Sequence, residues 1–93
     1  MKRSRFRPAA RRDLKRLVDF FSDAPPEIAE AMTQALEARV EQLRSFPFVG
    51  RPVSNTPLRE TIVPYGKSRC VIRYQVSDDA IVIVRIWHGR ENR

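Results

Sequence analysis

Apolar residues recur with helical spacing through the first half of the chain. A helix is predicted from Ala9 to Ser22, because its apolar residues fall at i, i+3, i+4 and i+7: Leu14, Leu17, Val18 and Phe21. Paired prolines then interrupt the pattern, and Pro26 suits the first turn of a second helix, predicted to run to about Ser45. Two helices joined by a short Pro-rich turn predict an antiparallel helical hairpin.

The period changes from 3.6 to 2 in the second half of the chain. After an irregular connection at 46–58, strands are predicted at 59–63, 69–76 and 81–87, separated by turns at 65–67 and 77–80. A further short strand is expected around Phe6, closed by Pro8. The sequence therefore predicts one α+β domain over residues 1–93, with the helical hairpin packed on a small antiparallel β-sheet.

The last hairpin gives a register for the side chains. If Val76 pairs with Ile81, then Arg69 lies opposite His88, Val71 opposite Ile86 and Arg73 opposite Val84. A slip of one residue would exchange the two faces, so the prediction depends on the turn at 77–80. The face of Cys70, Ile72 and Tyr74 is expected to pack on the helices, which leaves Arg69, Arg73 and His88 on the open face.

Charge narrows the possible partners. Eighteen Lys and Arg against eleven acidic residues give a net charge of +7, and all but three of the cations are arginines. Arginine binds phosphates and carboxylates in bidentate fashion, so a nucleic acid or an acidic protein is a plausible partner. An arginine-rich surface without any specific partner fits the composition equally well. A single cysteine, no run of about 18 apolar residues and no secretory signal lead us to expect a cytoplasmic protein without a membrane span.

Few residues could carry chemistry. One histidine and one cysteine fall short of a metal site, and three glycines form neither a P-loop nor a dinucleotide-binding motif, so neither metal nor cofactor is expected. Cys70 is expected to be a buried structural thiol. The carboxylates of the helices and their turn form no catalytic pair and are interpreted as a solvated face: Asp13, Asp19, Asp23, Glu27 and Glu30.

The segment R-I-W-H-G-R-E-N-R at the end of the chain places His88 beside Arg90 and Arg93 where a strand ends. A general acid–base histidine among arginines that hold a phosphodiester would make a metal-free ribonuclease site. Alternatively, Trp87 caps the core, His88 is an ordinary strand-end residue and the tail is solvated.

Several short motifs, taken in order, resemble the RelE/ParE superfamily of toxins from type II toxin–antitoxin systems. They cover nearly the whole chain: F-R-P-A-A-R-R-D-L at 6–14, F-P-F-V-G-R-P at 46–52, L-R-E at 58–60, V-I-R-Y-Q-V at 71–76 and V-R-I-W-H-G-R-E at 84–91. The resemblance implies a helical hairpin on an antiparallel sheet. It also implies a cognate antitoxin as partner, whose extended and often acidic C-terminal region suits a basic toxin.

The superfamily contains gyrase inhibitors similar to ParE and ribosome-dependent, metal-free mRNA endoribonucleases similar to RelE. Many RNA-cleaving members carry an arginine three residues before the aromatic residue of the middle strand. Here Tyr74 matches the aromatic residue, but the arginine position holds Val71. The W-H-G-R-E ending also looks more like ParE, so the resemblance favours a DNA gyrase inhibitor with no catalytic residue.

Three alternatives therefore stay open. For a gyrase inhibitor, we expect the surface that binds the target or partner to comprise Arg69, Arg73, His88, Arg90 and Arg93. For a ribonuclease acting on mRNA in the ribosome, His88 would be the acid or base, and Arg69 and Arg90 would hold phosphate. A degenerate module that only binds antitoxin is the third alternative.

Overall fold

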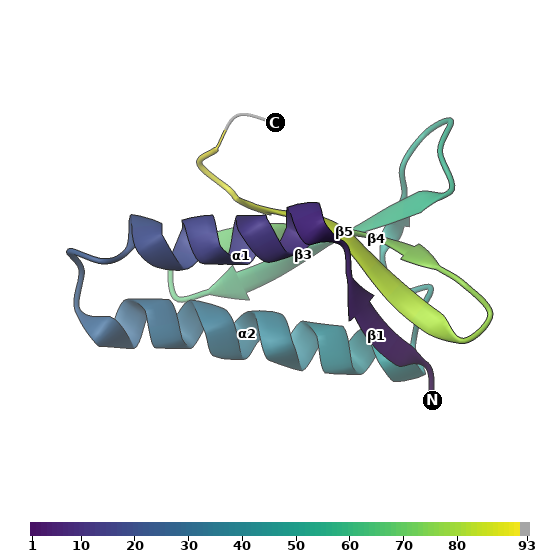
Figure 1. Cartoon of the computed structure of the whole chain (residues 1–93), viewed down its shortest axis with the longest axis horizontal. Coiled ribbons are helices and arrows are strands. Elements are labelled where there is room, and N and C mark those ends of the chain that lie inside the picture. Colours follow the sequence, from purple (N-terminus) through teal and green to yellow (C-terminus); the bar gives the residue numbers. More distant parts are fainter. Residues whose placement is uncertain (92–93) are drawn as a thin grey trace.

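The computed structural model describes residues 1–91, and both predicted helices and all the predicted strands are present (Figure 1). Their bounds, in chain order, are β1 Arg3–Phe6, α1 Pro8–Phe20, α2 Pro26–Ser45, β2 Arg51–Pro52, β3 Leu58–Tyr65, β4 Ser68–Val76 and β5 Ala80–His88. The connection at 46–58, predicted to be irregular, contains the two-residue strand β2.

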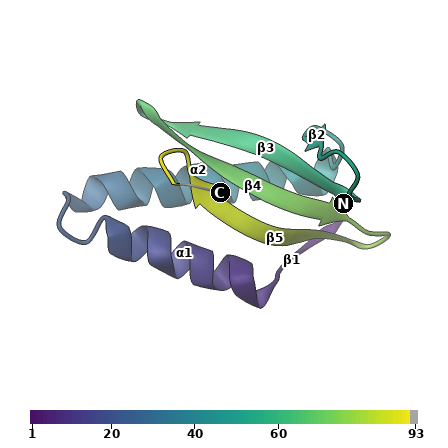
Figure 2. The ribbon, with the colours of Figure 1, turned by 90° about the horizontal axis from the view of Figure 1, so that it is seen from above.

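The strands form one five-stranded sheet in the order β1-β5-β4-β3-β2. Strands β2 to β5 are antiparallel neighbours, whereas β1 runs parallel to β5, so the sheet is mixed. Figure 2 shows α2 passing behind β3 and β4, with α1 lying beside β5. This is the predicted α+β arrangement of a helical hairpin on a sheet, with the N-terminal strand added at one edge.

Local sequence explains where the helices begin and end. Each starts with a proline, Pro8 or Pro26, whose fixed φ suits the first turn and whose missing N–H is not needed there. Helix α2 carries Glu27 in its first turn and Arg44 in its last, both favourable to the helix dipole. The strand predicted at 59–63 continues through Pro64, because the short β2 leaves this part of β3 at the sheet edge, where proline is tolerated.

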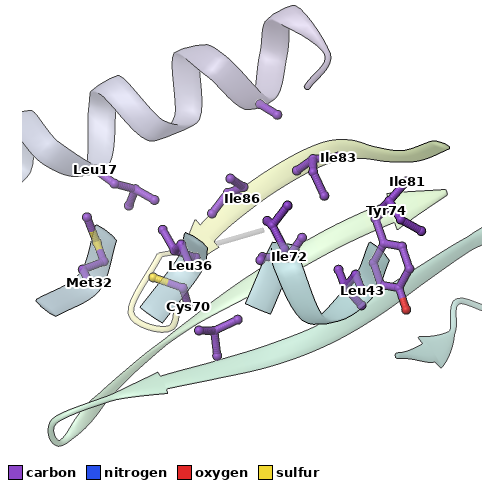
Figure 3. Close-up of a cluster of buried hydrophobic side chains, with 13 residues drawn as sticks. Leu17, Met32, Leu36, Leu43, Cys70, Ile72, Tyr74, Ile81, Ile83 and Ile86 are labelled. Atoms are coloured by element: carbon purple, nitrogen blue, oxygen red, sulfur yellow. The ribbon is translucent and has the colours of Figure 1, made fainter. Parts of the chain in front are cut away.

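The core lies between the hairpin and the sheet (Figure 3). Fully buried side chains from both helices and from β4 and β5 meet there, among them Leu17, Met32, Leu43, Ile72, Tyr74, Ile83 and Ile86. Cys70 is also in this cluster, as predicted, and burial raises the pKa of its thiol to about 11. A thiol with that pKa is almost fully protonated at neutral pH and is a poor nucleophile.

The predicted register between β4 and β5 is correct near the turn and wrong beyond it. Val76 pairs with Ile81 and Tyr74 with Ile83, but Arg73 pairs with Arg85 and Cys70 with His88. Val84 is therefore an extra residue, a β-bulge that exchanges the faces of everything after it in β5. As a result, Arg85 and Trp87 share the face of Arg73, and His88 moves from the predicted open face to the side of the helices.

Candidate functional site

The face of the sheet opposite the helices carries a row of interacting side chains that crosses β3, β4 and β5. The guanidinium of Arg73 donates from Nε to Glu60 Oε2 at 2.8 Å and lies 5.0 Å from the centre of the Trp87 ring. Arg85 lies over the same ring at 5.2 Å. Two cations thus contact the indole, which is only 8% exposed, and each such contact contributes about 0.5–2 kcal/mol.

Arg85 connects this row to helix α1 through Asp13. Asp13 accepts hydrogen bonds from Arg85 Nε at 2.8 Å, from Arg16 Nη1 at 2.6 Å and from the backbone N–H of Ile86 at 2.8 Å. Burial alone would raise the pKa of Asp13, but these donors outweigh burial and lower it. The expectation that Asp13 belongs to a solvated face is wrong: it is 2% exposed and joins α1 to β5.

The C-terminal turn is also attached to α1. Both carboxylate oxygens of Glu91 accept from Arg16 at 3.0 Å, and Oε1 accepts the backbone N–H of His88 at 2.8 Å. Burial opposes ionisation of Glu91, yet the bonds from Arg16 and His88 lower its pKa overall. Helix α1, which is distant in sequence, therefore holds residues 88–91 in position.

His88 is 6% exposed and packs among aromatic rings rather than on the open face. Its ring lies 5.8 Å from that of Phe21, and its Nδ1 accepts the N–H of Arg90 at 3.2 Å. The neutral ring then carries its proton on Nε2, which donates to the Tyr65 hydroxyl at 2.6 Å. Burial first, and the charge of Arg90 second, lower the pKa of His88, so the ring is neutral at physiological pH.

A hollow of about 350 Å³ opens on the sheet between the loop at 49–51 and the C-terminal turn. Its lining includes the apolar Ile62 and Val71, the charged Arg51, Arg69 and Glu60, and His88. Arg69 is pressed against the turn, since a Cβ on Gly89 would lie 2.8 Å from its Cγ, and glycine is needed there for this close approach. A neighbouring hollow of about 480 Å³ lies between the β3–β4 turn and Arg90.

The structure therefore divides the five residues predicted to bind a target. Arg69 and Arg90 are exposed and line these hollows. Arg73 lies on the same face but is paired with Glu60. His88 also borders both hollows, but its buried ring packs against Phe21 of the hairpin. Arg93 lies outside the described residues. Reasoning from the sequence missed Asp13, Arg85 and the position of Trp87, although one signal was available: Asp13 is on the helix stripe of Ala10 and Leu17.

Two negative findings apply to residues 1–91. No three histidine, cysteine or acidic side chains of this part of the chain are grouped so that they could hold a metal ion. Neither helix is long and apolar enough to cross a membrane.

The fold matches those of solved toxins. The chromosomal ParDE system of Pseudomonas aeruginosa superposes with a TM-score of 0.74 at 22% identity, covering 95% of this chain and 96% of that one. The toxin–antitoxin complex RelBE2 of Mycobacterium tuberculosis gives a TM-score of 0.62 at 26% identity, covering 94% and 96%. The α+β fold is thus shared with these solved proteins.

Sequence comparison identifies the family. The family model described as ParE toxin of type II toxin-antitoxin system, parDE, matches residues 5–93, and the chain belongs to this family. Toxin RelE1 of Caulobacter vibrioides is 38% identical over 84 residues, covering 90% of this chain and 89% of the relative. Toxin RelE3 of the same organism is 37% identical over the full length of both chains. The family is that of ParE, whereas these relatives are named RelE, so the comparisons establish a type II toxin without deciding its target.

Proposed function

We propose that this toxin inhibits DNA gyrase and is neutralised by a cognate antitoxin with an acidic C-terminal region. The observation that carries the proposal is the position of His88. Both nitrogens of this ring, the only imidazole in the chain, are engaged, and it packs under the aromatic residues of the hairpin. His88 borders the two hollows beside Arg69, but its ring is only 6% exposed and both its nitrogens are engaged, so it offers no free nitrogen to exchange protons there. Such a site suits binding to a protein better than cleavage of RNA.

The hollow beside Arg69 supports the same choice. Its lining includes Val71, at the position where many RNA-cleaving relatives carry an arginine, and this side chain is apolar and buried. A guanidinium there would hold a phosphate, whereas Val71 and Ile62 offer apolar surface among the charged side chains of Arg51, Arg69 and Glu60. Such a mixed apolar and charged surface resembles a protein-binding patch.

Charge also supports an acidic antitoxin. The chain carries a net charge of +7, and both solved neighbours are parts of toxin–antitoxin systems. Electrostatic attraction between a basic toxin and an acidic segment would speed association and favour the correct partner. An expression system that supplies the antitoxin from the adjacent gene should therefore yield a soluble complex with this chain.

Expression of the chain without antitoxin tests the target. A gyrase inhibitor should cause filamentation and a DNA damage response while mRNA stays intact, and purified toxin should stabilise the cleaved gyrase–DNA complex. Arg69→Glu should weaken both effects, whereas Arg3→Glu, at the opposite end of the sheet, serves as the matched control. Growth arrest without any DNA damage response would contradict the proposal, and no growth arrest at all would indicate a module that only binds antitoxin.

A ribosome-dependent mRNA endoribonuclease is the second candidate, favoured by the names of the Caulobacter relatives at 37–38% identity. In this case Arg69 and Arg90, at the hollows on either side of the C-terminal turn, would hold the phosphodiester. His88 would have to leave its contacts with Tyr65 and Arg90 to act as acid or base. Rapid translation arrest with codon-phased mRNA cuts would support this function over gyrase inhibition.

A further inference from the structure

The outer side of helix α1 carries a row of cations that the proposed function does not use. Arg7 precedes the helix, and Arg11, Arg12 and Lys15 follow on its solvent side, all four exposed. We call these four residues the basic ridge. Eight of the first sixteen residues are Lys or Arg, and the one acid among them, Asp13, is buried under the helix, so it does not neutralise the ridge.

The ridge cations have no partner within the described part of the chain. None of their side chains makes a hydrogen bond or ion pair with residues 1–91, in contrast to Arg16, the next residue after Lys15, which binds Asp13 and Glu91. The nearest acid on the exposed side of the helix is Asp19, beyond Lys15. The ridge is therefore a continuous positive surface that is available to a ligand.

The placement of these charges lowers the stability of the helix. Arg7 and Arg11, and then Arg11 and Lys15, are like charges four residues apart, each pair unfavourable on a helix surface. Positive charges near the N-terminus also oppose the helix dipole, and α1 has no acid in its first turn and no base in its last. Helix α2 has the opposite and favourable arrangement, so stability does not explain the charges of α1.

We propose that the basic ridge binds the phosphate backbone of duplex DNA. From Arg7 to Lys15 the helix rises by roughly 12 Å, a length that faces three to four successive phosphates of one strand. Backbone contacts need only cations and carry no sequence information, whereas a protein interface needs an apolar centre. No exposed large apolar side chain lies between Arg7 and Lys15, since Leu14 packs against the core, and the first exposed one along the helix is Val18.

This inference goes beyond gyrase inhibition and does not rest on it. The hollow beside Arg69 lies on the sheet face opposite the helices, so the ridge and the candidate target-binding face are different surfaces. A toxin with both could contact a protein with one surface and DNA with the other. Binding to DNA can be measured directly, so failure of either proposal leaves the other standing.

The test is fluorescence anisotropy of a short, mixed-sequence duplex DNA titrated with the full chain at several salt concentrations. The ridge variant carries Arg11→Gln, Arg12→Gln and Lys15→Gln. The control of equal net charge carries Arg3→Gln, Arg5→Gln and Lys67→Gln, all exposed and outside the ridge. At about 0.15 M salt the ridge variant should bind at least about tenfold more weakly than wild type. The slope of log K against log salt should also fall by about two to three, while the control stays close to wild type.

Folding and partner controls keep the result interpretable. The ridge variant should unfold at the same temperature as wild type or higher, because unfavourable charge pairs are removed. Equal losses of DNA affinity in the ridge and control variants would mean that binding depends only on net charge, and this result would overturn the proposal. So would unchanged binding by the ridge variant, or displacement of the DNA by polyglutamate at equal charge concentration, which would point to an acidic protein instead.

Discussion

Asp13 of α1 and Arg85 of β5 are 72 residues apart in sequence and form an ion pair of 2.8 Å. The same carboxylate accepts the backbone N–H of Ile86, two residues after the bulge at Val84. Strand β1 pairs with β5 only as far as Ile83, so this N–H lies on a part of β5 that β1 does not cover. Asp13 thus satisfies a backbone donor near the bulge and fixes Arg85 beside Trp87 at the same time.

Loss of the Asp13 carboxylate should destabilise the protein. Asp13→Asn keeps the shape of the side chain but removes the charge that holds Arg85 and Arg16, and hydrogen bonds to charged groups contribute about 1.5–3 kcal/mol. Because both arginines are about two-fifths exposed, we expect the free energy of unfolding to fall by about 1–3 kcal/mol in urea denaturation. Asp19→Asn, exposed on the same helix, should change it by less than about 0.5 kcal/mol.

Stability should fall in acid because of Asp13 and Glu91. The folded pKa of each lies below its ordinary value, 3.8 for Asp13 and 4.5 for Glu91, so the folded state binds these protons less readily than the unfolded state. The stabilisation is fully present above those ordinary values and is lost as the pH falls through the lower folded pKa. The double variant Asp13→Asn, Glu91→Gln should therefore have a lower urea midpoint than wild type at neutral pH. This difference should shrink as the pH falls below the ordinary pKa values of the two carboxyls. A difference in urea midpoint that does not change with pH would show that ionisation of these carboxylates does not cause the loss of stability in acid.

Tyr74 and Gly50 should be energetically coupled. The buried Tyr74 hydroxyl accepts the N–H of Gly50 at 2.9 Å and donates to the carbonyl of Pro47 at 2.8 Å, which holds the exposed loop with Phe48. Tyr74→Phe leaves both backbone groups without that partner and should lower the free energy of unfolding by about 1–3 kcal/mol. A Cβ on Gly50 would lie 2.5 Å from this hydroxyl, so Gly50→Ala should cost less in the Tyr74→Phe background. Strictly additive losses in a double-mutant cycle would contradict this coupling.

Arg73 is expected to contribute to target binding through its charge and to the stability of the sheet through its contact with Trp87. Arg73→Glu would place a second carboxylate beside Glu60 and remove a cation from the indole, so it should weaken growth arrest and also destabilise the sheet. The exchange variant Glu60→Arg, Arg73→Glu restores the ion pair and should recover the unfolding temperature but not the toxicity. Recovery of full toxicity by the exchange variant would exclude Arg73 from the target-binding surface.

His88 distinguishes the two candidate functions. In a gyrase inhibitor, His88→Gln should leave growth arrest largely intact, because the ring faces the hairpin. In a ribonuclease it should lower mRNA cleavage by roughly 10²–10⁴-fold, the usual contribution of a proton-transfer group. The folded pKa of His88 is below its ordinary 6.5, so wild-type stability should decline as the pH drops below 6.5, and this decline should be absent in His88→Gln. Thermal unfolding across that range checks the second expectation independently of activity.

The sequence by itself determined the elements and the family. Apolar spacing gave both helices to within two residues, since a stripe such as Met32, Leu36, Val40 and Leu43 has to be buried on one side of a helix. Alternation gave β4 and the burial of Cys70 and Tyr74, and a run of β-branched and aromatic residues gave β5. The order of the motifs along the chain, taken together, indicated the toxin family.

Only the tertiary structure decided which side chains share the open face. The bulge at Val84 cannot be predicted from the alternation of apolar and polar residues, because β5 is apolar almost throughout and its two faces have similar sequences. One extra residue brought Trp87 to the arginines and turned His88 toward Tyr65. The burial of Asp13 likewise required β5 to lie beside α1, since an acid on an apolar stripe is stable only where distant donors surround it.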